Sequence, residues 1–242
     1  MKFDTRLDGA VFTSHDTKLL GVFYGAAGDT PRPTVVLSHG VPGFEKNLDI
    51  AYALRDSGWN SLCYHYRGCW GSGGAFSLEG LVDDLRAATD WIRTQPSVDS
   101  ECLVLIGMSG GGYATLAVGG DDPRFKALVA LSPLIDPAKA QLSMDGLNEI
   151  ASFVHGVTGA QLKDQFGRLP SIMEATSKLR NRRILLITGD IDELFPPDHF
   201  RLFVKEVPTV RWQRFPLGDH YLSACRKEVV ETVLAWLKEV CT

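Results

Sequence analysis

Short apolar runs alternate along the chain with segments in which apolar residues recur every three or four positions. The runs are rich in β-branched residues and predict buried strands, whereas the longer period predicts helices that bury one face. The predicted strands are residues 10–14, 18–24, 34–38, 60–66, 102–106, 127–131, 183–188 and 210–215, and the predicted helices are residues 45–57, 78–94, 111–118 and 223–240. This alternation predicts an α/β fold with a mostly parallel central sheet flanked by helices, and the first two strands form a hairpin at its edge.

One stretch breaks the alternation. Residues 136–181 lie between two predicted strands and carry only weakly patterned helical sequence. A connection of that length is too long for a plain loop in a compact domain. We therefore expect a single domain over residues 1–242, with a small helical lid inserted at residues 136–181.

Composition and charge exclude several classes of protein. The 242 residues are 45% hydrophobic and 22% charged, with a net charge of −4, which is ordinary globular composition. No basic stripe indicates nucleic-acid binding, and the apolar runs are far shorter than the ~20 residues of a membrane helix. Residues 1–6 lack the apolar core of a signal peptide. We expect a cytoplasmic protein without nucleic-acid or membrane partners, either a monomer or a homodimer.

The cysteine pattern and the sequence motifs give no indication of a metal or a cofactor. Five cysteines are an odd number and contain no CxxC pair, so they predict neither a disulfide framework nor a zinc site, and we expect them to be reduced. The chain also lacks an H-E-x-x-H, a Walker loop and a G-x-G-x-x-G fingerprint. We therefore expect no metal and no cofactor.

The strongest local motif is Gly107-Met108-Ser109-Gly110-Gly111, which follows a predicted strand and precedes a predicted helix. In that context G-x-S-x-G forms a sharp turn that presents the serine hydroxyl at a helix N-terminus. Backbone N–H groups at that end can stabilise an oxyanion. The motif predicts Ser109 as a catalytic nucleophile.

A nucleophilic serine needs a base and an acid that orients the base. His220 follows the last predicted strand and Asp192 follows the strand before it, so all three residues lie at carboxyl ends of strands. Asp190 is the rival for the acid, and Asp219 is too close to His220 in sequence to face it. The chain order Ser109, Asp192, His220 is the one expected for this architecture.

Together these blocks give the chain a resemblance to α/β-hydrolase-fold serine hydrolases over nearly its full length. It is carried by residues 38–43 (SHGVPG), residues 66–74 (YRGCWGSGG), the elbow, and the Asp192 and His220 segments. The chain resembles the small esterase, dienelactone-hydrolase-like and serine-aminopeptidase-like branch, although dienelactone hydrolases usually carry cysteine at the nucleophile. The resemblance implies an oxyanion hole formed by the backbone N–H groups of Val41 and Gly110, with His39 bracing the loop.

The expected function is therefore hydrolysis of small to medium carboxylic esters through an acyl-enzyme intermediate. An aminopeptidase-like amidase and an acyl thioesterase are the alternatives, and a non-catalytic ligand-binding protein of the same fold is a further one. Trp70, Met108 and His155 are the candidate substrate-binding residues, because they lie in the glycine-rich loop, the elbow and the predicted lid.

Overall fold

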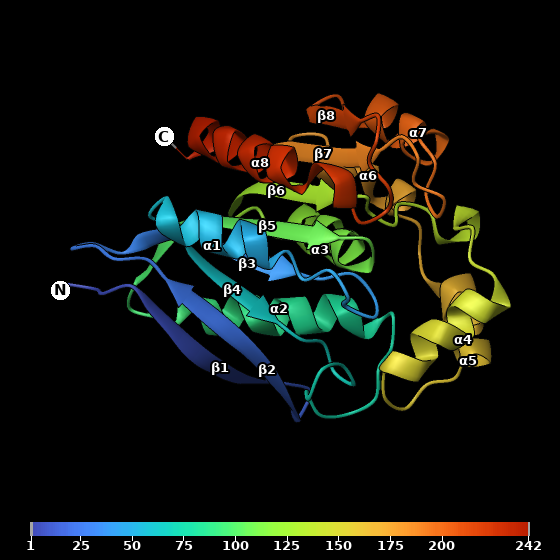
Figure 1. Cartoon of the computed structure of the whole chain (residues 1–242), viewed down its shortest axis with the longest axis horizontal. Coiled ribbons are helices and arrows are strands. Elements are labelled where there is room, and N and C mark those ends of the chain that lie inside the picture. Colours follow the sequence, from blue (N-terminus) through green and yellow to red (C-terminus); the bar gives the residue numbers. More distant parts are fainter. Residues whose placement is uncertain (1, 242) are drawn as a thin grey trace.

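A computed structural model of the chain describes residues 2–241. Its central element is an eight-stranded sheet in the order β1-β2-β4-β3-β5-β6-β7-β8 (Figure 1). The pairings β1–β2 and β2–β4 are antiparallel, and all the others are parallel. The strands are β1 (Arg6–Ser14), β2 (Thr17–Gly25), β3 (Arg32–Ser38), β4 (Asn60–Tyr64), β5 (Val98–Met108), β6 (Phe125–Leu131), β7 (Ile184–Gly189) and β8 (Val210–Phe215). The structure confirms the predicted mostly parallel α/β sheet and its edge hairpin.

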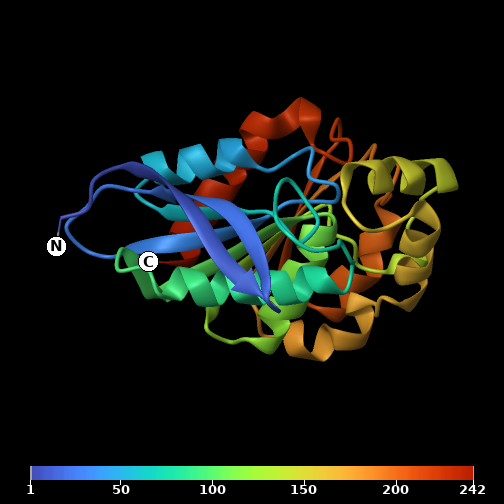
Figure 2. The same ribbon diagram turned by 90° about the horizontal axis from the view of Figure 1, so that it is seen from below.

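Helices cover both faces of the sheet. Figure 2 shows α1 (Leu48–Asp56) and α8 (Arg226–Val240) on one side and α2 (Gly80–Arg93) and α3 (Gly110–Asp121) on the other. Alternate residues of the central strands therefore point into two separate apolar clusters, with Leu105 of β5 in one and Ile106 in the other. Burial on both faces is the reason that these strands appear in the sequence as continuous apolar runs.

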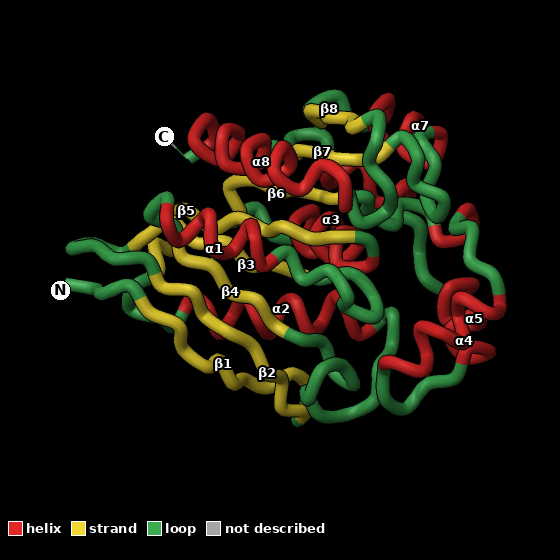
Figure 3. The backbone as a smooth tube through the Cα atoms, in the orientation of Figure 1, coloured by secondary structure: helices red, strands yellow, loops and turns green. Residues whose placement is uncertain are grey.

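The segment between β6 and β7 folds into helices. They are α4 (Met144–Phe153), α5 (Gly159–Arg168) and α6 (Thr176–Leu179), with 3-10 turns at Pro137–Lys139 and Ile172–Ala175. Figures 1 and 3 show α4 and α5 set apart from the sheet, beyond the ends toward which the parallel strands run. This arrangement places α4 and α5 at the edge of the sheet where open α/β folds form their sites.

A further helix, α7 (Asp198–Glu206), lies between β7 and β8 and was not predicted from the sequence. Two prolines, Pro196 and Pro197, precede it directly, and Pro is favoured at a helix start. Phe200 and Phe203 are both fully buried and attach α7 to the core. None of the helices within residues 2–241 is long and apolar enough to cross a bilayer.

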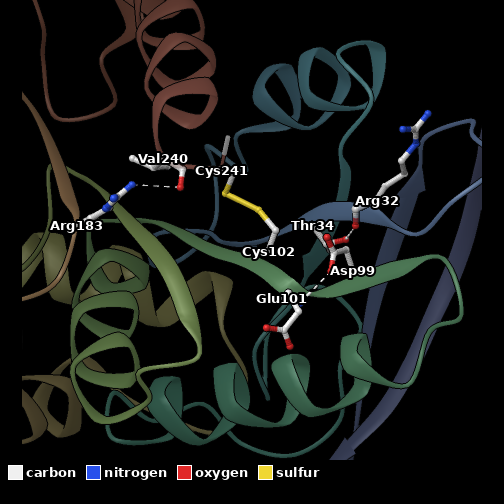
Figure 4. Close-up of a disulfide and its surroundings, with 8 residues drawn as sticks. All are labelled: Arg32, Thr34, Asp99, Glu101, Cys102, Arg183, Val240 and Cys241. Atoms are coloured by element: carbon white, nitrogen blue, oxygen red, sulfur yellow. Dashed lines mark hydrogen bonds between the residues drawn. A yellow bond between two sulfur atoms is a disulfide. The ribbon is translucent and has the colours of Figure 1, made fainter.

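The expectation that the cysteines are all reduced is wrong. Cys102 of β5 and Cys241 after α8 form a disulfide across 139 residues (Figure 4). Cys63, Cys69 and Cys225 are free and buried. The pairing depends on α8 returning along the sheet to the beginning of β5. Counting cysteines and their spacings gives no signal for such a contact, because it exists only in the folded topology.

Candidate active site

Ser109 occupies a strained turn between β5 and α3. Its backbone has φ 53° and ψ −119°, a conformation that residues other than glycine rarely adopt. Glycines make this turn feasible, because a Cβ at Gly107 would collide with the backbone of Gly111 and a Cβ at Gly111 would collide with the carbonyl of Ser38. The N–H of Ser109 donates to the carbonyl of Leu131 at 2.9 Å. Strand, turn and helix therefore hold the serine in one place.

Asp192 and His220 meet across two neighbouring loops. His220 donates from Nδ1 to Asp192 Oδ2 at 2.9 Å, and both side chains are buried. The second carboxylate oxygen of Asp192 accepts the backbone N–H groups of Leu194 and Phe195, each at 2.9 Å. The carboxylate is thus fixed by its own loop while it orients the imidazole.

The rival acids have other partners. Asp190 forms an ion pair with Arg214 at 2.8 Å. The Asp219 carboxylate accepts the backbone N–H of Ser223 at 2.7 Å. The geometry therefore leaves Asp192 as the carboxylate that contacts the His220 ring.

Ser109 and His220 line the same cavity, which has a volume of about 190 Å³. Apolar side chains form most of its wall: Val41, Pro42, Phe44, Leu78, Leu134, Leu142, Ile150, Leu162, Phe166, Leu194 and Phe195. Many of these residues come from the segment between β6 and β7. Glu149 and Tyr221 are the lining side chains, apart from Ser109 and His220, that carry polar groups.

The loop after β3 reaches Ser109 closely. A Cβ at Gly40 would lie 3.1 Å from the Ser109 Cβ, and a Cβ at Gly110 would lie 3.3 Å from Val41 Cγ2. Val41 and Gly110 also line the cavity. Both residues therefore lie near Ser109 in the wall of the cavity.

His39 lies under this loop and is almost fully buried. It donates from Nδ1 to the carbonyl of Gly40 at 2.6 Å, and its ring packs edge-on against Tyr66. Burial lowers the pKa of His39 to about 3, so the ring is neutral at ordinary pH. These contacts hold the loop that carries Val41 against the segment that follows β4.

The three candidate substrate-binding residues do not line the cavity. Trp70 donates from Nε1 to the carbonyl of Pro42 at 2.7 Å, and Lys46 lies over its ring. Met108 is the last residue of β5 and is fully buried in one of the two apolar clusters. His155 donates from Nδ1 to the carbonyl of Gly74. Trp70 and His155 thus bond to neighbouring loops, and Met108 is part of the core.

Sequence reasoning missed the residues that do form the wall, above all Phe44, Ile150 and Phe166. Phe44 lies in a loop. The signal of Ile150 and Phe166 in the sequence is weak, because α4 and α5 are short helices with few fully buried positions. Across residues 2–241 no three His, Cys, Asp or Glu side chains gather as metal ligands would.

Comparison with protein families matches residues 47–242 to a model described as the prolyl oligopeptidase family. Among curated proteins, the quorum-quenching protein AidA of Acinetobacter baumannii (strain MDR-ZJ06) is 26% identical over 164 residues, covering 65% of this chain and 52% of AidA. The uncharacterized protein YfhR of Salmonella typhi is 35% identical over 224 residues, covering 88% of this chain and 74% of YfhR. The matched part of this chain thus spans about half the length of AidA.

Solved structures share the architecture. Est1E from Butyrivibrio proteoclasticus, with ferulic acid bound, superposes with a TM-score of 0.80 at 18% identity, covering 96% of this chain and 99% of Est1E. At that identity the likeness concerns the fold. It confirms the α/β-hydrolase fold expected from the sequence.

Proposed function

Because this chain belongs to the prolyl oligopeptidase family and is therefore an α/β-fold hydrolase, we propose that it cleaves carboxylic esters by serine catalysis. The observation that carries the proposal is the shared cavity. Ser109, in an elbow conformation, and His220, bonded to the buried carboxylate of Asp192, face the same apolar space. Nucleophile, base and orienting acid are the parts that acyl transfer requires.

In this proposal Ser109 Oγ attacks the ester carbonyl while His220 Nε2 takes the hydroxyl proton. Asp192 keeps the Nδ1 proton in place and stabilises the imidazolium that forms. The imidazolium then protonates the leaving alkoxide, which departs as the alcohol and leaves an acyl-serine. His220 next removes a proton from water, the resulting hydroxide attacks the acyl group, and the acid is released as Ser109 regains its proton.

The backbone N–H groups of Val41 and Gly110 are the proposed oxyanion hole. Both residues line the cavity and lie side by side, and Gly110 stands at the N-terminus of α3. Donors fixed in the backbone need no reorganisation when negative charge develops on the carbonyl oxygen.

The cavity wall supports a substrate with an apolar acyl or alcohol group of small to medium size. Residues 136–181 contribute Leu142, Ile150, Leu162 and Phe166 to this wall, so we propose that this segment acts as the lid of the site. Amide hydrolysis is the second candidate. It is favoured by the family that the chain matches, which is named for peptidases.

The test is hydrolysis of p-nitrophenyl esters from acetate to decanoate, with methyl ferulate and an aminoacyl p-nitroanilide series measured beside them. Ser109→Ala is the matched variant. Ester turnover that Ser109→Ala lowers by about 10³-fold or more supports the proposal. Turnover of the anilides alone would establish the amidase instead, and ester turnover that survives in Ser109→Ala would refute serine catalysis.

A further inference from the structure

His199 is a buried histidine of α7 that lies outside the cavity but touches its supports. It is 6% exposed, and its Nε2 accepts the backbone N–H groups of Ile135 and Asp136 at 3.0 and 3.3 Å. These two residues begin the segment that leads from β6 into the cavity wall. One side-chain atom thus holds the entry of the 136–181 segment against α7.

The His199 ring also contacts Phe195, a residue that touches both Asp192 and His220. It stacks on Phe195 with ring centroids 4.9 Å apart and planes at 17°. Phe195 in turn stands edge-on to the His220 ring at 5.0 Å, and its backbone N–H donates to Asp192. Phe195 is therefore held between His199 and His220, and it contacts both members of the pair.

The backbone at Ile135 is also connected to the nucleophile. The preceding residue, Leu134, donates its N–H to the carbonyl of Ser109 at 3.1 Å and lines the cavity. A displacement of the chain at residues 135 and 136 would therefore reach the elbow through a single residue.

The two hydrogen bonds that His199 Nε2 accepts require one tautomer of the ring. An Nε2 that accepts two N–H groups must carry a lone pair, so the proton of the neutral ring is on Nδ1. Burial lowers the pKa of His199 to about 4, which keeps the ring neutral. Among the charged groups around it, Asp136 and Asp192 raise the pKa and Lys139 lowers it.

We propose that His199 is a positioning residue of the active site: its neutral ring fixes the backbone at residues 135–136 and holds Phe195 against His220 and Asp192. The proposal rests on the function proposed above, because it assumes that Ser109, His220 and Asp192 are the reacting unit. His199 itself does not line the cavity.

Two variants separate the two contacts. His199→Phe keeps an aromatic ring for the stack on Phe195 but removes the acceptor, and His199→Gln places an amide oxygen near the position of Nε2 but removes the ring. Phe203→Leu is the matched control, since Phe203 is a fully buried residue of the same helix whose side chain packs in the core. Should His199→Phe not fold, His199→Asn replaces it, because its shorter side chain cannot reach both N–H groups.

The measurement is kcat and KM per active site, with sites counted by a fluorophosphonate probe that phosphonylates an activated serine and releases fluoride. We expect His199→Phe to lower kcat about tenfold or more with a smaller change in KM, since a small misplacement of catalytic groups is costly. His199→Gln restores an acceptor and should recover part of that loss, and the part that it does not recover measures the contribution of the ring stacked on Phe195. Phe203→Leu should melt at a lower temperature with wild-type kcat.

Wild-type kcat per site in His199→Phe would overturn the inference, as would an equal loss of kcat in all three variants. Failure of the proposed function gives a different result. In that case the wild type itself neither hydrolyses an ester nor reacts with the fluorophosphonate.

Discussion

Asp192 and His220 are 28 residues apart in the chain, yet their side chains meet at 2.9 Å because they follow β7 and β8, two parallel strands that are neighbours in the sheet. The loops are joined by their backbones as well, since the N–H of Ile191 donates to the carbonyl of Gly218 at 3.1 Å. The close approach of Gly189 to Gly218 leaves no space for a Cβ at Gly189. The sheet therefore dictates the distance between acid and base.

This relationship predicts the effect of Asp192→Asn. The amide oxygen would stay with the backbone N–H groups of Leu194 and Phe195, so the NH2 group would face His220 Nδ1 and favour the wrong tautomer of the ring. The imidazolium would also lose its counter-charge, so we expect kcat for ester hydrolysis to fall about 10³-fold or more. The measurement is the initial rate on a short p-nitrophenyl ester at saturating substrate. Asp190→Asn is the control, because Asp190 pairs with Arg214 outside the site. Equal losses in both variants would contradict the assignment of Asp192.

The strand ends could be located from the sequence because they follow from burial. β8 has the predicted bounds, Val210–Phe215, and β7 and β6 differ from the prediction by one or two residues. β5 begins earlier than predicted, at Val98. The apolar pattern misses this start, because the exposed residues Ser100 and Glu101 interrupt the apolar run. Since parallel strands end at one edge, the residues that follow them could be expected to meet.

The cavity wall could not be predicted in this way. Phe44 belongs to a loop, and Phe166 belongs to α5, whose position depends on packing against other short helices. The sequence predicts Trp70 and His155 as substrate-binding residues from their positions alone, and their side chains bond to the backbone carbonyls of Pro42 and Gly74. His199 carried no signal at all, because its role depends on contacts with residues 63 and 64 positions earlier in the chain.

Gly146 gives a way to change the size of the cavity. It lies in α4 and lines the cavity, and a Cβ placed there would meet only Ser143 Oγ, at 3.5 Å. The side chain in Gly146→Leu should therefore project into the cavity, where we propose that the substrate binds. We expect the ratio of kcat/KM for p-nitrophenyl octanoate to that for the acetate to fall about tenfold, because one or two methylenes of apolar contact are worth roughly 1–3 kcal/mol.

Gly167→Leu is the control for this variant. Gly167 lies in α5, a Cβ there meets nothing within 4 Å, and the residue is outside the cavity lining. Both substitutions improve helix propensity to a similar degree, so a change in chain-length preference seen only in Gly146→Leu reports the cavity. An unchanged preference in Gly146→Leu would mean that the acyl group binds elsewhere.

The Cys102–Cys241 disulfide should stabilise the fold without affecting catalysis. A cross-link over 139 residues restricts the unfolded chain, and native disulfides typically contribute about 2–4 kcal/mol. Cys102 precedes Ser109 by seven residues along β5 and its turn, a distance of roughly 23 Å at about 3.3 Å per residue. We expect Cys102→Ser to lower the melting temperature by roughly 5–15 °C and to leave kcat/KM unchanged.

A reductant supplies the control for this prediction. Dithiothreitol should lower the melting temperature of the wild type to that of Cys102→Ser and should leave the variant unchanged. Cys241→Ser should behave like Cys102→Ser. A wild type that melts at the same temperature with and without reductant would show that the bond does not contribute.

Buried histidines predict how stability depends on pH. Burial lowers the pKa of His39 to about 3 and of His199 to about 4, from an ordinary value of 6.5. Between pH 6.5 and 4 the unfolded chain therefore binds protons that the folded chain does not, and the free energy of unfolding falls as the pH is lowered. Each histidine contributes about 1 kcal/mol per pH unit in this window.

Urea unfolding at pH 7.5, 6.0 and 5.0 measures this dependence. Carboxylates also contribute to it, so the informative quantity is the difference between the wild type and His199→Gln, whose side chain does not titrate. We expect the variant to lose stability less steeply below pH 6.5, by about one proton, because the remaining slope comes from His39 and the other groups. Phe203→Leu should be less stable at every pH but should keep the wild-type slope. Parallel curves for the wild type and His199→Gln would mean that His199 binds its proton at the same pH in the folded and the unfolded protein. That result would contradict its role as a buried acceptor for the N–H groups of residues 135 and 136, since both burial and this role favour the neutral ring.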